Sequence, residues 1–207
     1  MRDRFGSVNH NGDRDHRVAV LVLDGAKALD VGIAAHVFAK RPSMPYEVRV
    51  CGVQPGTAEG WNGLAYAVGH GLEELAWADT VLVPGYRNPA DRTTPPAAID
   101  ALRAAHKRGA RIAAISTGAF TLANAGLLDG HTATTHWDYT HVLRDRYPEV
   151  NVDENVLFAE GLVPPLSVRT TEERTDEGSA LDVAQIACGS CTSKTLFVLL
   201  SEAITAG

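Results

Sequence analysis

The apolar positions of the chain fall into short runs that alternate with segments of helical period. Residues 17–23 and 80–83 are almost wholly apolar, as expected of strands that are covered on both faces of a sheet. Residues 46–52 alternate and predict a further strand. Residues 30–40 and 97–108 repeat their apolar side chains at helical spacing. Strands and helices joined by short turns predict an α/β sandwich with a mostly parallel sheet.

The segment 111–137 gives the sharpest local pattern. A buried strand over residues 112–115 is followed at once by Ser116-Thr117-Gly118 and then by a helical pattern that reaches Leu127. A helix that begins at such a turn offers unpaired N–H groups and the positive end of its dipole. The Ser116 hydroxyl is therefore a candidate nucleophile, although serine is also a preferred N-cap residue.

Ligands of open parallel sheets bind beyond the carboxyl ends of the strands. Three polar strand ends are expected to meet there, namely residues 24–30, Pro84-Gly85 and Ser116. The remaining pattern predicts a loop or hairpin at 53–70, a short helix at 73–78, a short strand at 132–135, a helix at 137–147, a hairpin over 156–163 that turns at Glu160-Gly161, and apolar helices at 181–188 and 196–206.

Composition narrows the class of protein. A chain of 207 residues suits one domain with a sizeable core. Its net charge of -6 argues against nucleic-acid binding by this chain alone. No apolar run reaches the roughly 18 residues of a membrane span. Residues 1–16 lack the apolar core of a signal peptide, so we expect a disordered tail. Three cysteines, an odd number, favour the reducing cytoplasm.

Two other motifs could indicate a function. Residues 114–118 nearly match the G-x-S-x-G elbow of α/β-hydrolases, but that fold needs a histidine late in the chain and the last one is His141. Cys188 and Cys191 form a C-x-x-C, which can be a redox pair or half of a zinc site. No second pair accompanies it, so a pair at a helix end is favoured. We predict no metal and no cofactor.

A set of motifs resembles one family. VAVLVLDG at 18–25, ALDVG at 28–32, VLVPG at 81–85, and TGAFTLANAGLLDG with ATTHW across 117–137 are similar to the ThiJ/PfpI superfamily. Within it, the chain most resembles the amino-terminal domain of GlxA-like regulators of the AraC type. The resemblance covers residues 17–163 and implies a flavodoxin-like three-layer sandwich with a nucleophile elbow. Residues 164–207 match neither the end of that domain nor a helix-turn-helix module.

The resemblance also assigns roles. It places the family's cysteine nucleophile at Ser116 and its acidic partner at Asp30. The histidine of ATTHW is His136, and the oxyanion-binding N–H groups fall on Gly85 and Thr117.

Tyr86 is expected to wall the cleft. Since serine replaces the cysteine, we expect a small-molecule-binding sensor domain that forms a homodimer. The alternative is an isonitrile hydratase-like hydro-lyase, or a related amidase or glyoxalase-type enzyme, inactivated by that replacement.

Overall fold

The computed structural model describes residues 15–40, 46–156, 158–160 and 183–186. At its centre, six strands form one sheet in the order β2-β1-β5-β6-β10-β9. Their bounds are β1 (His16–Leu21), β2 (Tyr46–Cys51), β5 (Thr80–Val83), β6 (Arg111–Ile115), β9 (Phe158–Glu160) and β10 (Val183–Ile186). All neighbours are parallel except β9 and β10, which are antiparallel. The mostly parallel sheet predicted from the sequence is confirmed.

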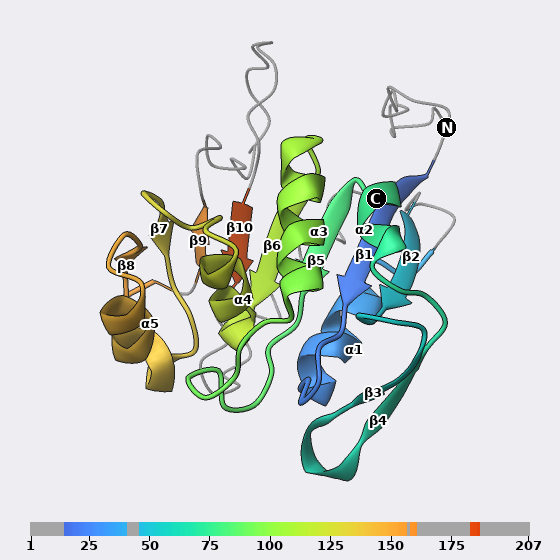
Figure 1. Cartoon of the computed structure of the whole chain (residues 1–207), viewed down its shortest axis with the longest axis horizontal. Helices are drawn as coiled ribbons and strands as arrows, with labels where there is room; N and C mark the ends of the chain where they lie inside the picture. The colour runs from blue at the N-terminus through green and yellow to red at the C-terminus, as the bar shows by residue number, and fades with distance from the viewer. Residues whose placement is uncertain (1–14, 41–45, 157, 161–182, 187–207) are drawn as a thin grey trace, which may run out of the picture.

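Helices cover both faces of this sheet (Figure 1). The helix α1 (Ala28–Val37) lies on one face, while α2 (Glu73–Trp77), α3 (Pro96–Lys107) and α4 (Ala119–Asn124) lie on the other. The side chains of β1 alternate between the two layers, with Leu21 packed in the cluster that contains Leu102 and Val20 in the cluster that contains Val31. This two-sided burial explains why β1 is apolar almost throughout.

The smaller elements lie around the sheet. A hairpin of β3 (Gly56–Glu59) and β4 (Ala65–Val68), joined by η1 (Trp61–Gly63), extends away from the sheet below α1 in Figure 1. The short strands β7 (Thr132–Ala133) and β8 (Asn151–Val152) pair with each other. The connection after β6 is η2 (Ser116–Gly118), and η3 (Trp137–Tyr139) leads into α5 (Thr140–Arg146).

One prediction near the end of the chain was wrong, and another is covered only in part. Within the predicted hairpin at 156–163, residues 158–160 form the strand β9, in which Glu160 lies opposite Ala184 of β10, and residues 161–163 lie outside the described residues. The segment 183–186 is a strand parallel to β6, whereas a helix was expected over 181–188. A short apolar run has no period that separates a strand from a helix, and pairing with the free edge of β6 decides the outcome.

Other predictions fall at or beyond the limits of the described residues. His16, expected in the tail, is the first residue of β1. Residues 1–14 of the predicted tail, the helix at 196–206 and the C-x-x-C lie outside the described residues. Within the described ranges, no helix is long and apolar enough to cross a membrane.

The core makes a stability prediction. Leu102 is fully buried between α3 and the sheet. The substitution Leu102→Ala should therefore lower the free energy of unfolding by about 2–5 kcal/mol, measured by urea denaturation. The control Leu64→Ala, at a side chain that is 48% exposed, should change it by less than about 0.5 kcal/mol. Equal losses in both variants would contradict this account of the core.

Candidate functional site

The backbone turns sharply at Ser116. This residue follows β6 directly, has a φ of 54° and is 1% exposed. The other described non-glycine residues with positive φ are two asparagines, which tolerate this region better than serine does. A left-handed conformation costs a serine about 1–2 kcal/mol, so neighbouring contacts must hold it. The predicted strand, turn and helix are all present.

Contacts on either side of Ser116 hold the turn. The Thr117 hydroxyl donates to the carbonyl of Tyr86 at 2.6 Å and accepts the Tyr86 N–H at 2.8 Å. The Thr135 hydroxyl donates to the carbonyl of Ser116 at 3.0 Å. Gly118 packs so close to the carbonyl of Val83 that a Cβ there would overlap it. These contacts join the turn to the loop that follows β5 and to the segment before η3.

Gly85 joins the loop after β5 to the start of α1. Its carbonyl accepts the Lys27 N–H at 2.8 Å, and its own N–H donates to Oδ2 of Asp30 at 3.0 Å. A Cβ at this position would overlap the Asp30 carboxyl and approach the Thr117 hydroxyl to 3.0 Å. The N–H predicted to bind an oxyanion is thus already bonded to Asp30, and it can serve an oxyanion only if that bond opens.

Asp30 is a buried carboxyl group, 3% exposed. Burial raises its pKa to about 6, while the charge of Lys27 and the Gly85 N–H act in the opposite direction. The carboxyl is therefore close to half protonated at pH 6.

Lys27 is the site residue that the sequence analysis missed. Its ammonium group donates to the Ser116 hydroxyl at 3.5 Å. It lies between β1 and α1, one residue before the ALDVG motif. No periodicity singles it out, and the turn that contains it also carries the negative charge of Asp24. The hydroxyl of Ser116 thus faces a hydrogen-bond donor.

His136 lies beside this group but points elsewhere. Its ring stacks on Trp137 with centroids 5.6 Å apart, and its Nδ1 accepts the Asp138 N–H at 3.3 Å. Burial lowers the pKa of His136, and the charge of Lys27 lowers it further. None of its hydrogen bonds to described residues reaches Ser116, so His136 is not placed as the base that activates the hydroxyl.

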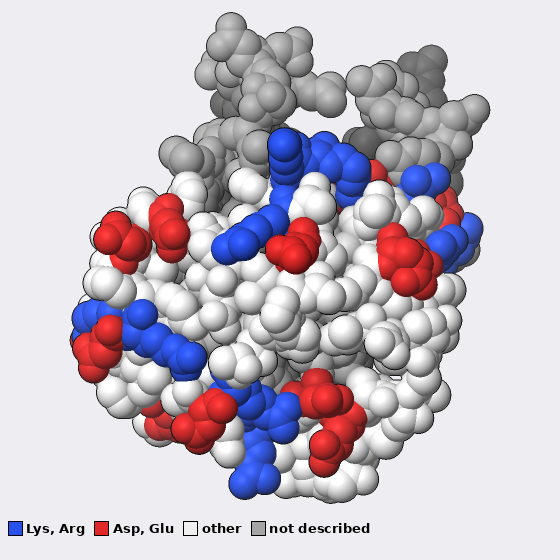
Figure 2. All heavy atoms as spheres, viewed as in Figure 1, with Lys and Arg blue, Asp and Glu red and all other residues white. Residues whose placement is uncertain are grey.

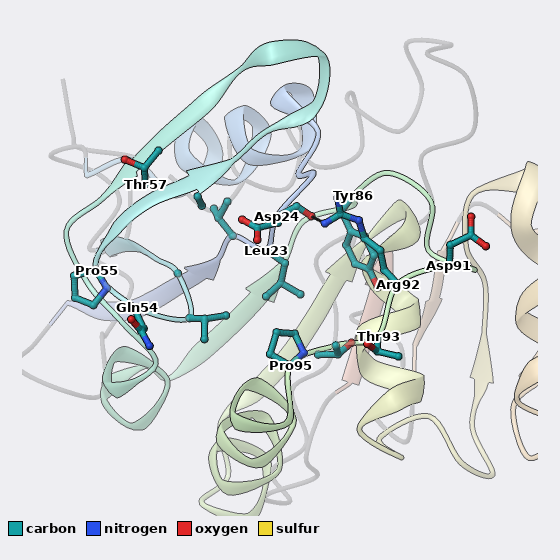
Figure 3. Close-up of a pocket in the computed structure, with 15 residues that line it drawn as sticks. Leu23, Asp24, Gln54, Pro55, Thr57, Tyr86, Asp91, Arg92, Thr93 and Pro95 are labelled. Carbon is teal, nitrogen blue, oxygen red and sulfur yellow. Dashed lines mark hydrogen bonds between the residues drawn. The ribbon is translucent and has the colours of Figure 1, made fainter.

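Figure 3 shows a cavity of the protein, whose volume is about 570 Å³. It opens at the carboxyl ends of β1 and β2 and under the loop that connects β5 to α3. Tyr86 lines it, as the sequence analysis expected of a cleft wall, whereas Ser116, Asp30 and His136 do not. Because the Tyr86 backbone is bonded to Thr117, this residue separates the cavity from the Ser116 site.

Two further groups, a cluster of possible metal ligands and a buried cysteine, lie outside the Ser116 site. Ligand atoms of His70, Glu73 and Glu74 lie within 4.8 Å of one another. They already have partners, since Glu74 pairs with His70 and Arg49 and Glu73 accepts the Gly71 N–H. These contacts account for the cluster without an ion. Burial raises the pKa of the Cys51 thiol to about 12, so that this cysteine is held as a neutral thiol near pH 7.

Comparisons with known proteins agree with this architecture. The model of the DJ-1/PfpI family matches residues 16–170. An uncharacterized protein in the cpoL 5' region of Streptomyces lividans is 35% identical over 135 residues, which are 64% of this chain and 96% of that protein. The HTH-type transcriptional regulator GlxA of Rhizobium meliloti is 32% identical over 154 residues, 71% of this chain and 47% of the regulator.

Solved structures share the fold. The crystal structure of an AraC family transcriptional regulator from Pseudomonas putida superposes with a TM-score of 0.66 over 92% of each chain, at 15% sequence identity. With 47% coverage, this chain spans less than half the length of the GlxA regulator that it matches. The resemblance to GlxA-like regulators inferred from the motifs is confirmed, and so is the flavodoxin-like fold.

The raised pKa of Asp30 should make the stability of the fold depend on pH. Its folded pKa of about 6 exceeds its unfolded value of about 4, so the folded state binds more protons between these pH values. Stability should therefore fall as pH rises from 4 to 6, by at most about 3 kcal/mol from this group. Asp30→Asn, whose amide oxygen can still accept the Gly85 N–H, should lose this component in urea denaturation at each pH. The same pH profile in both proteins would contradict it.

The charge of Lys27 should affect the pKa of His136. Removing the cation by Lys27→Gln should raise the pKa of His136, because the imidazolium then loses a repulsive neighbour. A titration of the His136 ring followed by NMR measures this pKa directly. Lys107→Gln, at the far end of α3, is the matched control and should leave it unchanged. An unchanged value in Lys27→Gln would place the ammonium away from the imidazole.

Proposed function

Because the chain belongs to the DJ-1/PfpI family, we propose that it is the small-molecule-binding sensor domain of a GlxA-like transcription regulator, with Ser116 in place of the family's cysteine. The relatives that support this proposal include regulators named GlxA and CdhR, of which the chain spans 47% and 34%. A sensor domain that occupies part of a longer regulator fits these shares. We further propose that it acts in the cytoplasm, where transcription takes place in bacteria.

The single observation that carries the proposal is the environment of the Ser116 hydroxyl. A serine hydroxyl becomes a nucleophile only when a neighbouring base accepts its proton. Here the group within hydrogen-bond distance is the Lys27 ammonium, which donates to the oxygen. His136, the histidine that the resemblance places in this site, accepts the Asp138 N–H at Nδ1. This environment suits binding of a ligand better than attack on one.

The face of the protein shown in Figure 2 carries acidic and basic side chains in mixture, with no continuous basic stripe. Together with the net charge of -6, this supports a chain that binds a small molecule and leaves DNA recognition to another segment. We expect the domain to form a homodimer, in keeping with the exposed apolar side chains of Leu29 and Trp137. Light scattering that returns a monomer would contradict the dimer.

A second candidate function is supported by the geometry of the turn. The left-handed residue after β6 and the buried Asp30 carboxyl are the parts that an isonitrile hydratase-like enzyme would need around a cysteine. With Ser116 changed to cysteine, a thiolate at this turn could attack a polarised carbon and allow water to add across it. Related amidase or glyoxalase-type chemistry would use the same groups.

Turnover separates the two functions. The wild-type protein, Ser116→Cys and the control Ser116→Ala should be assayed against isonitriles, 2-oxoaldehydes and amides. We expect the wild type to show no more turnover than Ser116→Ala, because among the described residues the hydrogen-bond partner of the hydroxyl is the Lys27 ammonium, which is a donor. Rapid wild-type turnover that disappears in Ser116→Ala would overturn the sensor proposal. Activity confined to Ser116→Cys would instead support the enzyme whose nucleophile has been replaced.

A further inference from the structure

We propose that the cavity beside the Ser116 site binds a small zwitterion of the α-amino-acid type, with the ligand carboxylate on Arg92 and its ammonium group on Asp24. This proposal names the ligand class of the sensor domain and rests on that proposed function. It also moves the ligand from the Ser116 hydroxyl to the opposite side of Tyr86.

The cavity occupies the crevice where the sheet changes direction. From β1 the chain continues outward to β2, whereas from β5 it continues to β6 on the other side, and β1 and β5 are neighbours. The loops after β1 and β5 therefore diverge and leave space between them, which is where open α/β sheets bind ligands. The volume of about 570 Å³ lies within the range of small-molecule sites.

Arg92 is held in place at the wall of this cavity. Its Nη1 donates a hydrogen bond to the carbonyl of Asp24 at 2.6 Å. The guanidinium also packs over Gly25, with Cζ 3.2 Å from the position that a Cβ of residue 25 would take. A guanidinium has five N–H donors, and this bond uses one of them. The remaining planar edge suits a carboxylate, which arginine binds through paired hydrogen bonds.

Asp24 supplies the opposite charge. Its Oδ1 accepts the Glu59 N–H at 3.0 Å, a bond that fixes the carboxylate at the cavity wall. In the described part of the chain, Arg92 forms no ion pair with Asp24 or with Asp91. Figure 3 shows Asp24 and Asp91 on opposite sides of Arg92. A cation and an anion that face one cavity without neutralising each other match a ligand that carries both charges.

The rest of the lining suits the body of such a ligand. Leu23, Val53 and Pro95 form apolar walls, and Gln54 and Thr93 add polar groups at the rim. The lining as a whole is more polar than apolar, which suits a ligand that carries charges at a small-molecule site. The lining therefore fits a zwitterionic head group with a short side chain.

The test is a binding titration of the full chain with a panel of α-amino acids. Each is paired with the acid that lacks the amino group and the amine that lacks the carboxylate; for L-alanine these are propionate and ethylamine. Calorimetry gives the Kd, and the thermal unfolding midpoint gives a second readout. We expect binding of one or more amino acids, with neither single-charge analogue of that amino acid binding as tightly.

Variants then locate the ligand. Arg92→Gln should raise the Kd about 10- to 100-fold, the effect of losing a charge-assisted hydrogen bond. Asp24→Asn, whose amide oxygen can still accept the Glu59 N–H, should raise it at least about tenfold. Arg92→Lys keeps the charge and should have a smaller effect. Arg87→Gln, an exposed residue of the same loop outside the cavity lining, is the matched control and should bind as the wild type does.

Three outcomes would overturn the proposal. If the amine alone binds as tightly as the amino acid, the site is a cation site. If binding survives Arg92→Gln and is lost in Lys27→Gln, the ligand lies over Ser116, and the sensor function stands while the cavity assignment fails. If no amino acid of the panel binds, the ligand class is wrong, whereas the sensor function is decided separately by the turnover of the wild type against Ser116→Ala.

Discussion

The left-handed turn at Ser116 is the constraint on which the rest of the site depends. A serine at a φ of 54° is strained, and the strain persists only because the surroundings fix both of its neighbours. Thr117 is bonded to the Tyr86 backbone through its hydroxyl, and Gly118 lies too close to the Val83 carbonyl for any side chain. The end of β6 therefore determines the path of the loop after β5.

That loop in turn divides the carboxyl edge of the sheet into two compartments. Gly85 links it to α1 through Lys27 and Asp30, on the side where the Ser116 hydroxyl lies. Tyr86 presents its other side to the cavity that contains Arg92. One short segment thus supports both a buried polar cluster and a ligand-sized cavity.

Lys27 sets the electrostatics of the polar cluster. Its charge limits the rise in the pKa of Asp30 that burial causes, and it lowers the pKa of His136. The same ammonium donates to the Ser116 hydroxyl. A site built around a cysteine thiolate would gain from such a cation, whereas a serine hydroxyl gains a donor and no base. A hydroxyl and a thiol at this position would therefore give the cluster different chemistry.

The sequence predicted the parts of the structure that leave a local pattern. Strands such as β1 and β5 are buried on both faces, so their sequences are apolar runs. The turn at Ser116 marks the point where such a run ends and the helical spacing of apolar residues begins. Asp30 was found because it stands at the head of a helix within a recognisable motif. These features depend on residues close together in the chain.

Features that depend on distant residues were not predicted. Arg92 reaches the carbonyl of Asp24 across 68 positions of sequence, so no local pattern indicates the cavity that they share. Lys27 was missed for the same reason, since Ser116 lies 89 positions away. The strand β10 was mistaken for a helix because a four-residue apolar segment acquires its identity from pairing with β6.

The most direct test is a map of where an amino acid binds, obtained from the backbone amide shifts of the ¹⁵N-labelled protein during titration. A ligand in the cavity should move the amides of Asp24, Arg92 and Thr94 first and most, and leave those of Lys27 and Thr135 nearly unchanged. Shifts concentrated instead around Ser116 and His136 would contradict the division of the sheet edge by Tyr86 and return the ligand to the family's nucleophile position.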